Sequence, residues 1–360
     1  MEALTAGRAE GSRAGEIRPL ESARRLSHAL RVEATTPEIS VLLPYRDAGS
    51  TVAEAIRSVL AQPLPLEVLA IDDGSRDSGP AQVVQLAKRD PRVVPLRAGG
   101  GLVAALERGR RAARAGILAR MDADDRCLPG RLAAQIHSLR QRPGVVGCRV
   151  ELFGDVAGGM RRYVAWQNAL LTPEAHARDL FVEAPLCHPS VALPAALLDA
   201  VGGYRDGDFP EDYDLWLRLH AAGAELRKVD HLGLAWRQHA ESFSRTDGRY
   251  RDAAFRDLKA RHLAPRLPAE RPLVVWGAGP TGKRFVRSLE PHGPRAARFV
   301  DIDPRKVGRV ARGAPIVAPE ALRPDDFVVV AVGSRGARGL VREALVSAGR
   351  VERVDFVCVA

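Results

Sequence analysis

The fold is decided by three stretches: ISVLLPYRD at residues 39–47, VLAIDDGS at residues 68–75 and ILARMDADD at residues 117–125. In each, a short run rich in Ile, Val and Leu ends in aspartates. Runs of this length predict buried strands, and the amphipathic segments between them predict helices. The alternation indicates βα units around a mainly parallel sheet, so we expect an α/β fold.

The same patterns place the individual elements. Ser50 is the expected N-cap of a helix that ends near residue 61, and Pro129 is expected in the first turn of another. Thr172 followed by Pro173 is typical of an N-cap and the first helical position. The predicted strands of the first part of the chain are Ile39–Leu43, Val68–Ile71, Val93–Leu96, Ile117–Met121 and Val145–Leu152.

The length of 360 residues favours two domains, because it exceeds what one hydrophobic core usually serves. Residues 1–37 lack sustained periodicity and predict a flexible tail. The α/β pattern occupies residues 38–245, and a polar, proline-containing stretch at 246–271 predicts a linker. A second βα pattern at 272–360 predicts a smaller, Rossmann-like α/β domain.

The net charge of +10 comes almost entirely from the last third of the chain. Residues 1–240 hold 31 Lys and Arg against 30 Asp and Glu, whereas residues 241–360 hold 23 against 14. A basic protein can bind nucleic acid, but no long basic run interleaved with aromatic residues occurs here. We therefore expect no nucleic-acid partner.

The apolar runs are strand-length, well short of the roughly 20 residues that cross a bilayer, so we expect no transmembrane segment. The first residues also lack the apolar stretch of a secretory signal. We predict a cytoplasmic protein, whose basic last third allows peripheral contact with the inner face of the membrane. Four widely spaced cysteines predict buried, reduced thiols.

Acidic residues follow three of the predicted strands: Asp47, then Asp72–Asp73, then the cluster Asp122–Asp125. Functional side chains of open α/β sheets collect at these carboxyl ends. Crowded carboxylates are unfavourable unless a cation or hydrogen-bond donors lie among them. The Asp-x-Asp spacing suits Mg²⁺ or Mn²⁺, which take oxygen ligands and bridge to phosphates. A surface turn with capping aspartates is the alternative for this motif taken alone.

In their order and spacing, these motifs resemble those of the family 2 glycosyltransferases. The resemblance continues through CHPS at 187–190, GGY at 202–204 and EDYDLW at 211–216, and covers about residues 38–245. It implies the GT-A fold. The fold class that we expect is therefore α/β, with a GT-A type, mainly parallel-sheet domain followed by the smaller Rossmann-like domain.

The resemblance also implies where a nucleotide-diphosphate sugar binds. The segment Pro44–Asp47 and Asp73 hold the nucleoside, while Asp122 and Asp124 bind ribose, diphosphate and Mg²⁺ or Mn²⁺, with Asp124 the closer metal ligand. Asp72 either supports Asp73 or caps the following turn. The implied donor-binding residues are Pro44, Tyr45, Arg46, Asp47, Asp73, Asp122, Asp124, Arg237 and Arg245.

Glu211 and Asp212 precede a segment with apolar residues at helical spacing, so we expect them at the N-terminus of a helix. Ordinary capping explains acids there, since the helix dipole stabilises a carboxylate. The resemblance implies instead that Asp212 takes the proton from the acceptor hydroxyl. Glu211 is then its orienting or acceptor-binding neighbour.

The stretch Trp236–Arg245 resembles the closing loop of the same family. There His239 completes the metal shell, and Arg237 and Arg245 clamp the diphosphate. A structural role is the alternative for His239, because a single histidine is more often structural. His188 resembles a position on the acceptor side, and a partly buried, hydrogen-bonded histidine is its alternative.

The second unit opens with LVVW at 273–276 followed by glycines at 277, 279 and 282, which fits G-x-G-x-x-G between a strand and a helix. Gly277, Gly279 and Gly282 would let the backbone approach a pyrophosphate, and Asp301 ends the next strand where a ribose would lie. A nucleotide is therefore a possible ligand of this unit. Glycines that serve packing alone are the alternative.

We thus expect an inverting, metal-dependent glycosyltransferase that moves a sugar from a nucleotide-diphosphate donor to the hydroxyl of a saccharide, lipid-linked saccharide or protein glycan. Synthesis of a cell-surface polysaccharide or glycoconjugate is a fitting role. Two alternatives stay open: a dinucleotide-dependent oxidoreductase or epimerase that works through the C-terminal unit, and a non-catalytic binder of sugar nucleotides.

Overall fold

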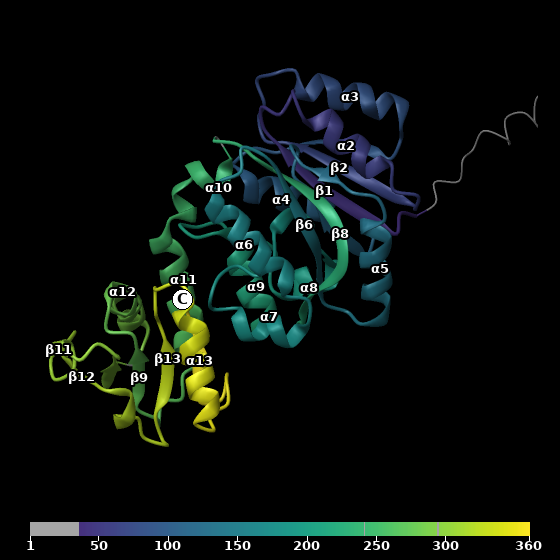
Figure 1. The fold of residues 1–360 in the computed structure, drawn as a ribbon. Coiled ribbons are helices and arrows are strands. Elements are labelled where there is room, and N and C mark those ends of the chain that lie inside the picture. The colour runs from purple at the N-terminus through teal and green to yellow at the C-terminus, as the bar shows by residue number, and fades with distance from the viewer. Residues whose placement is uncertain (1–35, 241, 294) are drawn as a thin grey trace, which may run out of the picture. The chain divides into compact units, whose positions relative to one another are not determined.

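The computed structural model describes residues 36–240, 242–293 and 295–360. The expected N-terminal tail, residues 1–37, therefore falls almost wholly outside the described residues. Residues 37–360 form one compact unit, which contains one eight-stranded and one six-stranded sheet (Figure 1). The expected α/β class, a large mainly parallel sheet followed by a smaller one, is confirmed. The domain boundaries stay a prediction.

The first sheet has the strand order β3-β2-β1-β4-β7-β6-β8-β5. Strands β3, β2, β1 and β4 run parallel, β7 is antiparallel to both β4 and β6, and β8 is parallel to β6. Its strands are β1 (Ile39–Tyr45), β2 (Leu66–Asp72), β3 (Val93–Arg97), β4 (Ile117–Arg120), β5 (Arg126–Cys127), β6 (Val145–Gly154), β7 (Ala192–Pro194) and β8 (Leu226–Gln238).

Strands β1 and β2 are buried along their whole length because helices cover both faces of the sheet. Successive side chains of β1 point to opposite faces. Val41 and Leu43 pack with α2 and α5, whereas Leu42 packs with α4 and α9. The helices of this part are α2 (Val52–Leu60), α3 (Gly79–Arg89), α4 (Leu102–Ala112), α5 (Arg131–Gln141), α6 (Gly158–Ala169), α7 (Pro173–Asp179), α8 (Ala195–Ala200) and α9 (Glu211–Ala221), with the 3₁₀ turn η1 (His188–Ser190).

Two expected helix starts are wrong. The N-cap of α2 is Thr51 rather than Ser50, and the Thr51 side chain makes no capping bond. Pro129 is not in the first turn of α5, because the left-handed backbone of Gly130 (φ 78°) separates it from the helix. The cap at Thr172 is confirmed: its hydroxyl accepts a hydrogen bond from the amide of Ala175 at 3.2 Å.

The predicted linker at 246–271 contains a helix, α11 (Asp252–Leu263), that the polar composition had hidden. Leu258, Ala260 and Leu263 of this helix are buried in the same apolar cluster as α9. Short elements flank α11: α10 (Phe243–Thr246), η2 (Gly248–Tyr250) and η3 (Ala264–Arg266).

The second sheet has the order β11-β12-β10-β9-β13-β14. The strands β12, β10, β9, β13 and β14 run parallel, and β11 lies antiparallel to β12 at the edge. The strands are β9 (Leu273–Trp276), β10 (Arg298–Val300), β11 (Val310–Ala311), β12 (Ala314–Val317), β13 (Phe327–Val330) and β14 (Phe356–Cys358). The helices are α12 (Pro280–Leu289) and α13 (Ala337–Ser347), with the turns η4 (Glu290–His292) and η5 (Pro319–Ala321).

All four cysteines are buried and free, as predicted. Among the described residues, no helix combines the length and apolar character needed to span a membrane.

Candidate active site

A cavity of about 1220 Å³ opens at the carboxyl ends of β1, β2 and β4 and extends to α9, α11 and α12. Because these three strands are parallel neighbours, the loops that follow them meet at one edge of the sheet. The cavity wall contains every site residue predicted in the first part of the chain: Pro44, Tyr45, Arg46, Asp47, Asp73, Asp122, Asp124, His188, Glu211, Asp212, Arg237, His239 and Arg245.

Hydrogen bonds connect the loops that follow β1 and β2. The carboxylate of Asp47 accepts a hydrogen bond from the amide of Arg76 at 2.7 Å, and its own amide donates to the Ser75 hydroxyl at 3.0 Å. Asp73 accepts from the amide of Gly101 at 3.0 Å. Asp72 accepts from the amide of Ser75 at 2.8 Å, so it caps the turn.

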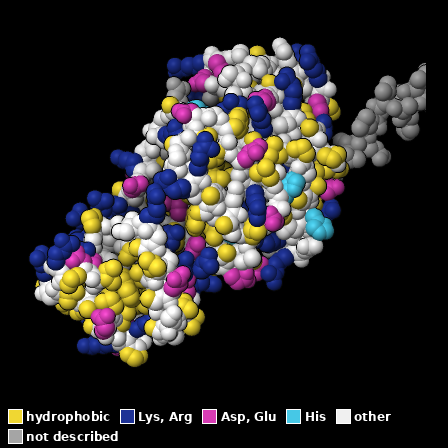
Figure 2. Space-filling model, in the orientation of Figure 1, with side chains coloured by type: hydrophobic (Ala, Val, Ile, Leu, Met, Phe, Trp, Pro, Cys, Tyr) yellow, Lys and Arg dark blue, Asp and Glu magenta, His cyan; other side chains and the backbone are white. Residues whose placement is uncertain are grey.

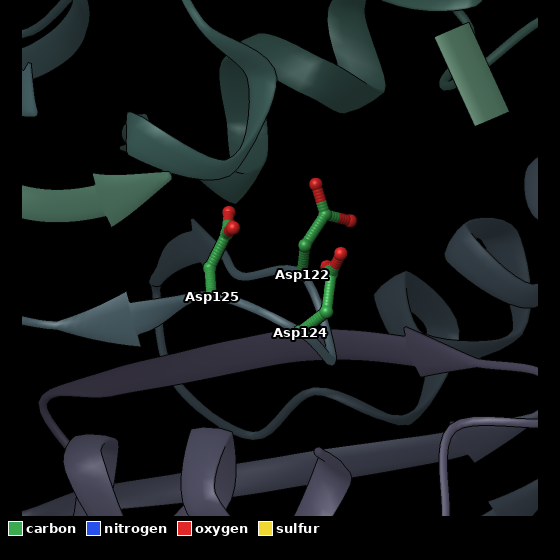
Figure 3. Close-up of side chains that lie close together, drawn as sticks. All are labelled: Asp122, Asp124 and Asp125. Atoms are coloured by element: carbon green, nitrogen blue, oxygen red, sulfur yellow. The ribbon is translucent and has the colours of Figure 1, made fainter. Parts of the chain in front are cut away.

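The loop between β4 and β5 carries an acidic cluster, Asp122, Asp124 and Asp125, with one oxygen of each lying within 4.8 Å of the others. Figure 3 shows all three carboxylates on the same side of the loop, with those of Asp122 and Asp124 next to each other. The side chains of Asp122 and Asp124 are 32% and 31% exposed, whereas Asp125 is 1% exposed. Two acids of the cluster are thus accessible from the cavity.

Burial and like charge disturb the titration of this cluster. Burial raises the pKa of Asp124, the charge of Asp122 adds to the effect, and His239 partly offsets it. The pKa of Asp125 lies well above its usual value for the same two reasons, burial and then its acidic neighbours. In the described structure, Oδ2 of Asp125 is buried without a hydrogen-bond partner. Ionisation of Asp124 and Asp125 is therefore unfavourable in this arrangement.

Three basic side chains surround the cluster. Arg120, the last residue of β4, is 3% exposed and forms an ion pair with Asp122. His239 lies 3.1 Å from Asp124 through Nε2. Arg237 donates from its amide to Asp125 at 2.7 Å and from Nε to the carbonyl of Asp124 at 2.8 Å.

Arg237 makes several contacts within the protein, unlike an arginine that serves only to clamp a phosphate. Its guanidinium lies 4.5 Å from the ring centre of Phe153 and donates to Glu54 at 3.3 Å, in addition to its bonds to the acidic loop. These contacts hold the shape of the loop. Arg245, in contrast, is exposed and makes one long hydrogen bond, of 3.5 Å, to the carbonyl of Asp155.

Glu211 and Asp212 begin α9, as the sequence predicts. Glu211 is 1% exposed and accepts hydrogen bonds from the Tyr250 hydroxyl at 2.9 and 2.8 Å. Nδ1 of His188 lies 3.6 Å from Glu211. Burial alone would raise the pKa of Glu211, but interactions with His188 and Tyr250 outweigh it, so the pKa falls below its usual value.

The pKa of Asp212 shifts in the opposite direction to that of Glu211. Burial, followed by the negative charge of Glu211, raises the pKa of Asp212 to about 8. The amide of Tyr213 donates to its carboxylate at 2.7 Å. Two adjacent acids therefore differ in their readiness to hold a proton, which is typical of acid–base sites.

His188 is buried among aromatic rings, 5.6 Å from Tyr204 and 5.8 Å from Trp216 between ring centres. Burial, followed by the charge of Arg120, lowers its pKa, so the imidazole is neutral at neutral pH. His188 is more buried than the structural alternative assumed, its Nε2 has no hydrogen-bond partner among the described residues, and it lines the cavity. Its role on the acceptor side stays a prediction.

The sequence analysis missed three residues of the site: Arg120, Asp125 and Tyr250. Arg120 ends a strand that was predicted, and an arginine directly before an acidic loop at a strand end is the signal that could have found it. Asp125 belongs to the motif but was given no role. Tyr250 lies in the predicted linker, where no pattern pointed to the site.

The glycine-rich turn after β9 is tightly packed. A side chain at Gly282 would come within 1.9 Å of the carbonyl oxygen of Gly277, whose φ is 122°. The carboxylate of Asp301 accepts from the amide of Ala278 and from Nζ of Lys306, each at 3.0 Å. Gly277, Gly279, Gly282 and Asp301 are not among the residues that line the large cavity.

Part of the chain matches the sequence model of a known family. Residues 40–200 match the sequence model of glycosyl transferase family 2. The match runs from β1 to α8, so it contains the acidic cluster but ends before α9. It supports the GT-A type for the first sheet.

Curated relatives carry matching names. An uncharacterised glycosyltransferase of Rickettsia conorii is 25% identical over 213 residues, which are 58% of this chain and 35% of that protein. The amylovoran biosynthesis glycosyltransferase AmsE of Erwinia amylovora is 28% identical over 190 residues, 51% of this chain and 70% of AmsE. The chain spans about a third of the length of the Rickettsia conorii protein and of an uncharacterised glycosyltransferase of Rickettsia felis. The family match and these names together support a glycosyltransferase.

Solved structures are also similar. The mannosyltransferase PcManGT from Pyrobaculum calidifontis, in complex with GDP-Man and Mn²⁺, is 19% identical, with a TM-score of 0.45. The similarity covers 68% of this chain and 69% of that chain.

Proposed function

We propose that this chain is an inverting, divalent-metal-dependent glycosyltransferase that moves a sugar from a nucleotide-diphosphate donor to an acceptor hydroxyl. The observation that carries the proposal is that acids from separate strand ends and from the start of α9 line a single cavity. The family match, which covers the acidic loop, supports the donor half of the site.

The donor is assigned to the strand ends. Pro44–Asp47 and Asp73 receive the nucleoside, on loops that hydrogen bonds hold together. Asp122 and Asp124 face the diphosphate, and Arg245 approaches it from the exposed rim. Arg237 holds the loop of Asp124 in place and contributes a positive charge beside the diphosphate.

The cluster fits Mg²⁺ or Mn²⁺. Its donors are hard carboxylate oxygens, burial and like charge disfavour ionisation of Asp124 and Asp125, and a cation would lower their raised pKa values. Asp124 and Asp122 would hold the ion, with His239 adjacent. When bound, such an ion stabilises the negative charge that develops on a departing diphosphate.

Asp212 is assigned the role of base. The acceptor oxygen bonds to the anomeric carbon while the bond from that carbon to the nucleoside diphosphate breaks, and the hydroxyl proton passes to the Asp212 carboxylate. Attack opposite the leaving group inverts the anomeric centre. A pKa of about 8 makes Asp212 a stronger base than an ordinary aspartate. Glu211, held by Tyr250 and His188, keeps its charge beside it and orients the acceptor.

The six-stranded sheet is assigned as a Rossmann-like unit. Its parallel strands follow the order third, second, first, fourth, fifth, and its glycine-rich turn joins the first strand to a helix. A nucleotide in this unit is a further part of the proposal, although Asp301 is already bonded to the turn and to Lys306. A role in the synthesis of a cell-surface polysaccharide or glycoconjugate is also part of the proposal, and the similar protein AmsE is named for amylovoran biosynthesis.

One screen tests the proposal: release of nucleoside diphosphate from UDP- and GDP-sugars by the full chain, with Mn²⁺ or with EDTA. We expect release with Mn²⁺ alone, and loss of release in Asp124→Ala. A chain that binds these donors without turnover across a broad acceptor panel would be the non-catalytic binder. Protection against heating by NAD(H), without response to any nucleotide sugar, would instead favour the oxidoreductase or epimerase.

A further inference from the structure

The cavity has a second end that is basic. Beyond α9 it is walled by α11 and α12, which contribute Arg256, Lys259 and Arg284 together with the rings of Phe255 and Phe285. Figure 2 shows Lys and Arg side chains gathered over the region of α10, α11 and α12. This end lies outside residues 40–200, which match the family model.

Lys259 is the most informative of these residues, because it is 8% exposed and charged lysines are almost never buried without a partner. Its ammonium donates to two backbone carbonyls, those of Val182 and Val359. Among the described residues it forms no ion pair. An ammonium has three donors, so one is left for a ligand, and Lys259 lines the cavity.

The two arginines nearby are also uncompensated. Nε of Arg256 donates to the neutral hydroxyl of Ser288 at 3.2 Å. Within the described ranges, neither Arg256 nor Arg284 forms an ion pair with a carboxylate. Glu183 and Asp252 line the same cavity, and their charges act on Lys259 from beyond contact distance. Lys259, Arg256 and Arg284 thus line the cavity, and none of them contacts an anion in the part of the chain that the structure describes. Lys259 is buried, Arg256 is half-buried and Arg284 is exposed.

We propose that this basic end binds a phosphate or diphosphate group of the acceptor. The inference rests on the proposed glycosyltransferase function, and it names the acceptor's chemical class. Lys259 is the buried cation of this end, and an uncompensated buried charge is costly, so an anion placed beside Lys259 would be bound strongly. Arginine forks suit phosphate oxygens, and Thr281 brings the first turn of α12 to the same wall. The acceptor hydroxyl then reaches Asp212 within the same cavity.

The acidic and basic ends would thus receive different phosphates. The donor diphosphate needs a cation at Asp122 and Asp124, whereas the acceptor phosphate needs none at Arg256, Lys259 and Arg284. Binding in the presence of EDTA therefore separates the two. Inorganic pyrophosphate is the probe, and calorimetric titration of the full chain measures its affinity.

We expect Arg284→Gln and Arg256→Gln each to weaken pyrophosphate binding about tenfold, the effect of losing one charge-assisted contact. Arg287→Gln is the matched control: Arg287 is exposed on the same helix but does not line the cavity, so affinity should not change. Asp124→Asn should leave affinity unchanged as well. Lys259→Met should also weaken binding, and circular dichroism checks that this buried variant folds.

Equal affinity in wild type, Arg284→Gln and Arg256→Gln, or no binding by the wild type, would overturn the inference. Pyrophosphate binding without turnover of any nucleotide sugar would overturn the proposed function alone. Turnover without pyrophosphate binding would overturn the basic subsite alone. Farnesyl diphosphate identifies the source: affinity at least about tenfold above that of pyrophosphate supports a lipid-linked acceptor, and equal affinity supports a soluble phosphate.

Discussion

The loop after β4 and the loop after β10 occupy the same kind of place, the carboxyl end of a parallel strand, yet their acids differ in electrostatics. Asp124 and Asp125 after β4 have raised pKa values, mainly because burial and like charge disfavour ionisation. Asp301 after β10 has a lowered pKa, since hydrogen bonds from backbone amides and Lys306 outweigh its burial.

This difference distinguishes a structural acid at a strand end from a ligand-binding one. Asp301 is satisfied by its own chain and ties a turn together. In the cluster at Asp122–Asp125, burial and like charge disfavour the ionisation of Asp124 and Asp125, and such a cost persists in folded proteins mainly at functional sites. Position in the fold is therefore shared by both loops, and only the balance of partners distinguishes a ligand site from a structural one.

The substitution Asp124→Ala gives the largest expected effect and tests whether Asp124 is a functional acid. We expect transfer to fall by about a thousandfold, because stabilisation of the leaving diphosphate supplies several kcal/mol. The melting temperature without metal should stay equal or rise, since a like charge is removed. Rates of nucleoside diphosphate release and thermal unfolding measure both. Retained transfer with a large loss of stability would show that Asp124 is a structural acid.

A smaller effect is expected from Asp212→Asn, about a hundredfold to a thousandfold on kcat with little change in KM for the donor. The isosteric amide keeps the amide contact of Tyr213 but cannot accept a proton. Steady-state kinetics with a saturating acceptor measures the change. An unchanged kcat would remove Asp212 from the role of base.

The pH dependence of kcat/KM should follow Asp212, whose pKa of about 8 is raised above its unfolded value. The active carboxylate is scarce at pH 6 and forms as the pH rises through 8, so the rate should increase roughly 50-fold between pH 6 and 8. Folding stability should move in the opposite direction, falling from about pH 4 to 8, because the native state binds the extra proton. A rate independent of pH in this range contradicts the assignment.

The smallest expected effect is a difference in the free energy of unfolding between two matched variants, one from each loop. Asp301→Asn should lower the free energy of unfolding at pH 7 by about 1–3 kcal/mol, because hydrogen bonds to a buried charge are lost. Asp125→Asn should leave that free energy equal or higher, because a disfavoured ion is replaced by a neutral group. Urea unfolding of both variants measures the difference, and equal destabilisation would remove the distinction.

Much of the first sheet could be predicted because its signals are local. Apolar runs such as those of β1 and β2 end in aspartates, and neighbouring parallel strands must place those ends together. The starts of α2 and α5 were misplaced, since cap geometry at Thr51 and Gly130 depends on backbone angles that composition does not fix.

Glu211, Asp212 and His188 of the proposed acceptor half could be predicted, but Tyr250 and Lys259 could not, because tertiary packing brings them to the cavity. Tyr250 reaches Glu211 across 39 positions of sequence.

Lys259 lies in a polar stretch that predicts a linker, yet it is buried beside the backbone carbonyls of Val182 and Val359. Leu258 and Leu263 of the same helix are buried in the apolar core. A lysine in such a segment ordinarily predicts an exposed side chain.

The most direct test of the central claim, that acids from separate strand ends gather a divalent cation, is a titration of the full chain with Mn²⁺ in the presence of UDP or GDP. We expect one saturable site, proton release on binding, and an affinity more than about tenfold weaker in Asp124→Asn, because even the loss of an outer-shell partner of a metal weakens its binding by that much. Equal Mn²⁺ affinity in the wild type and in Asp124→Asn would contradict this claim.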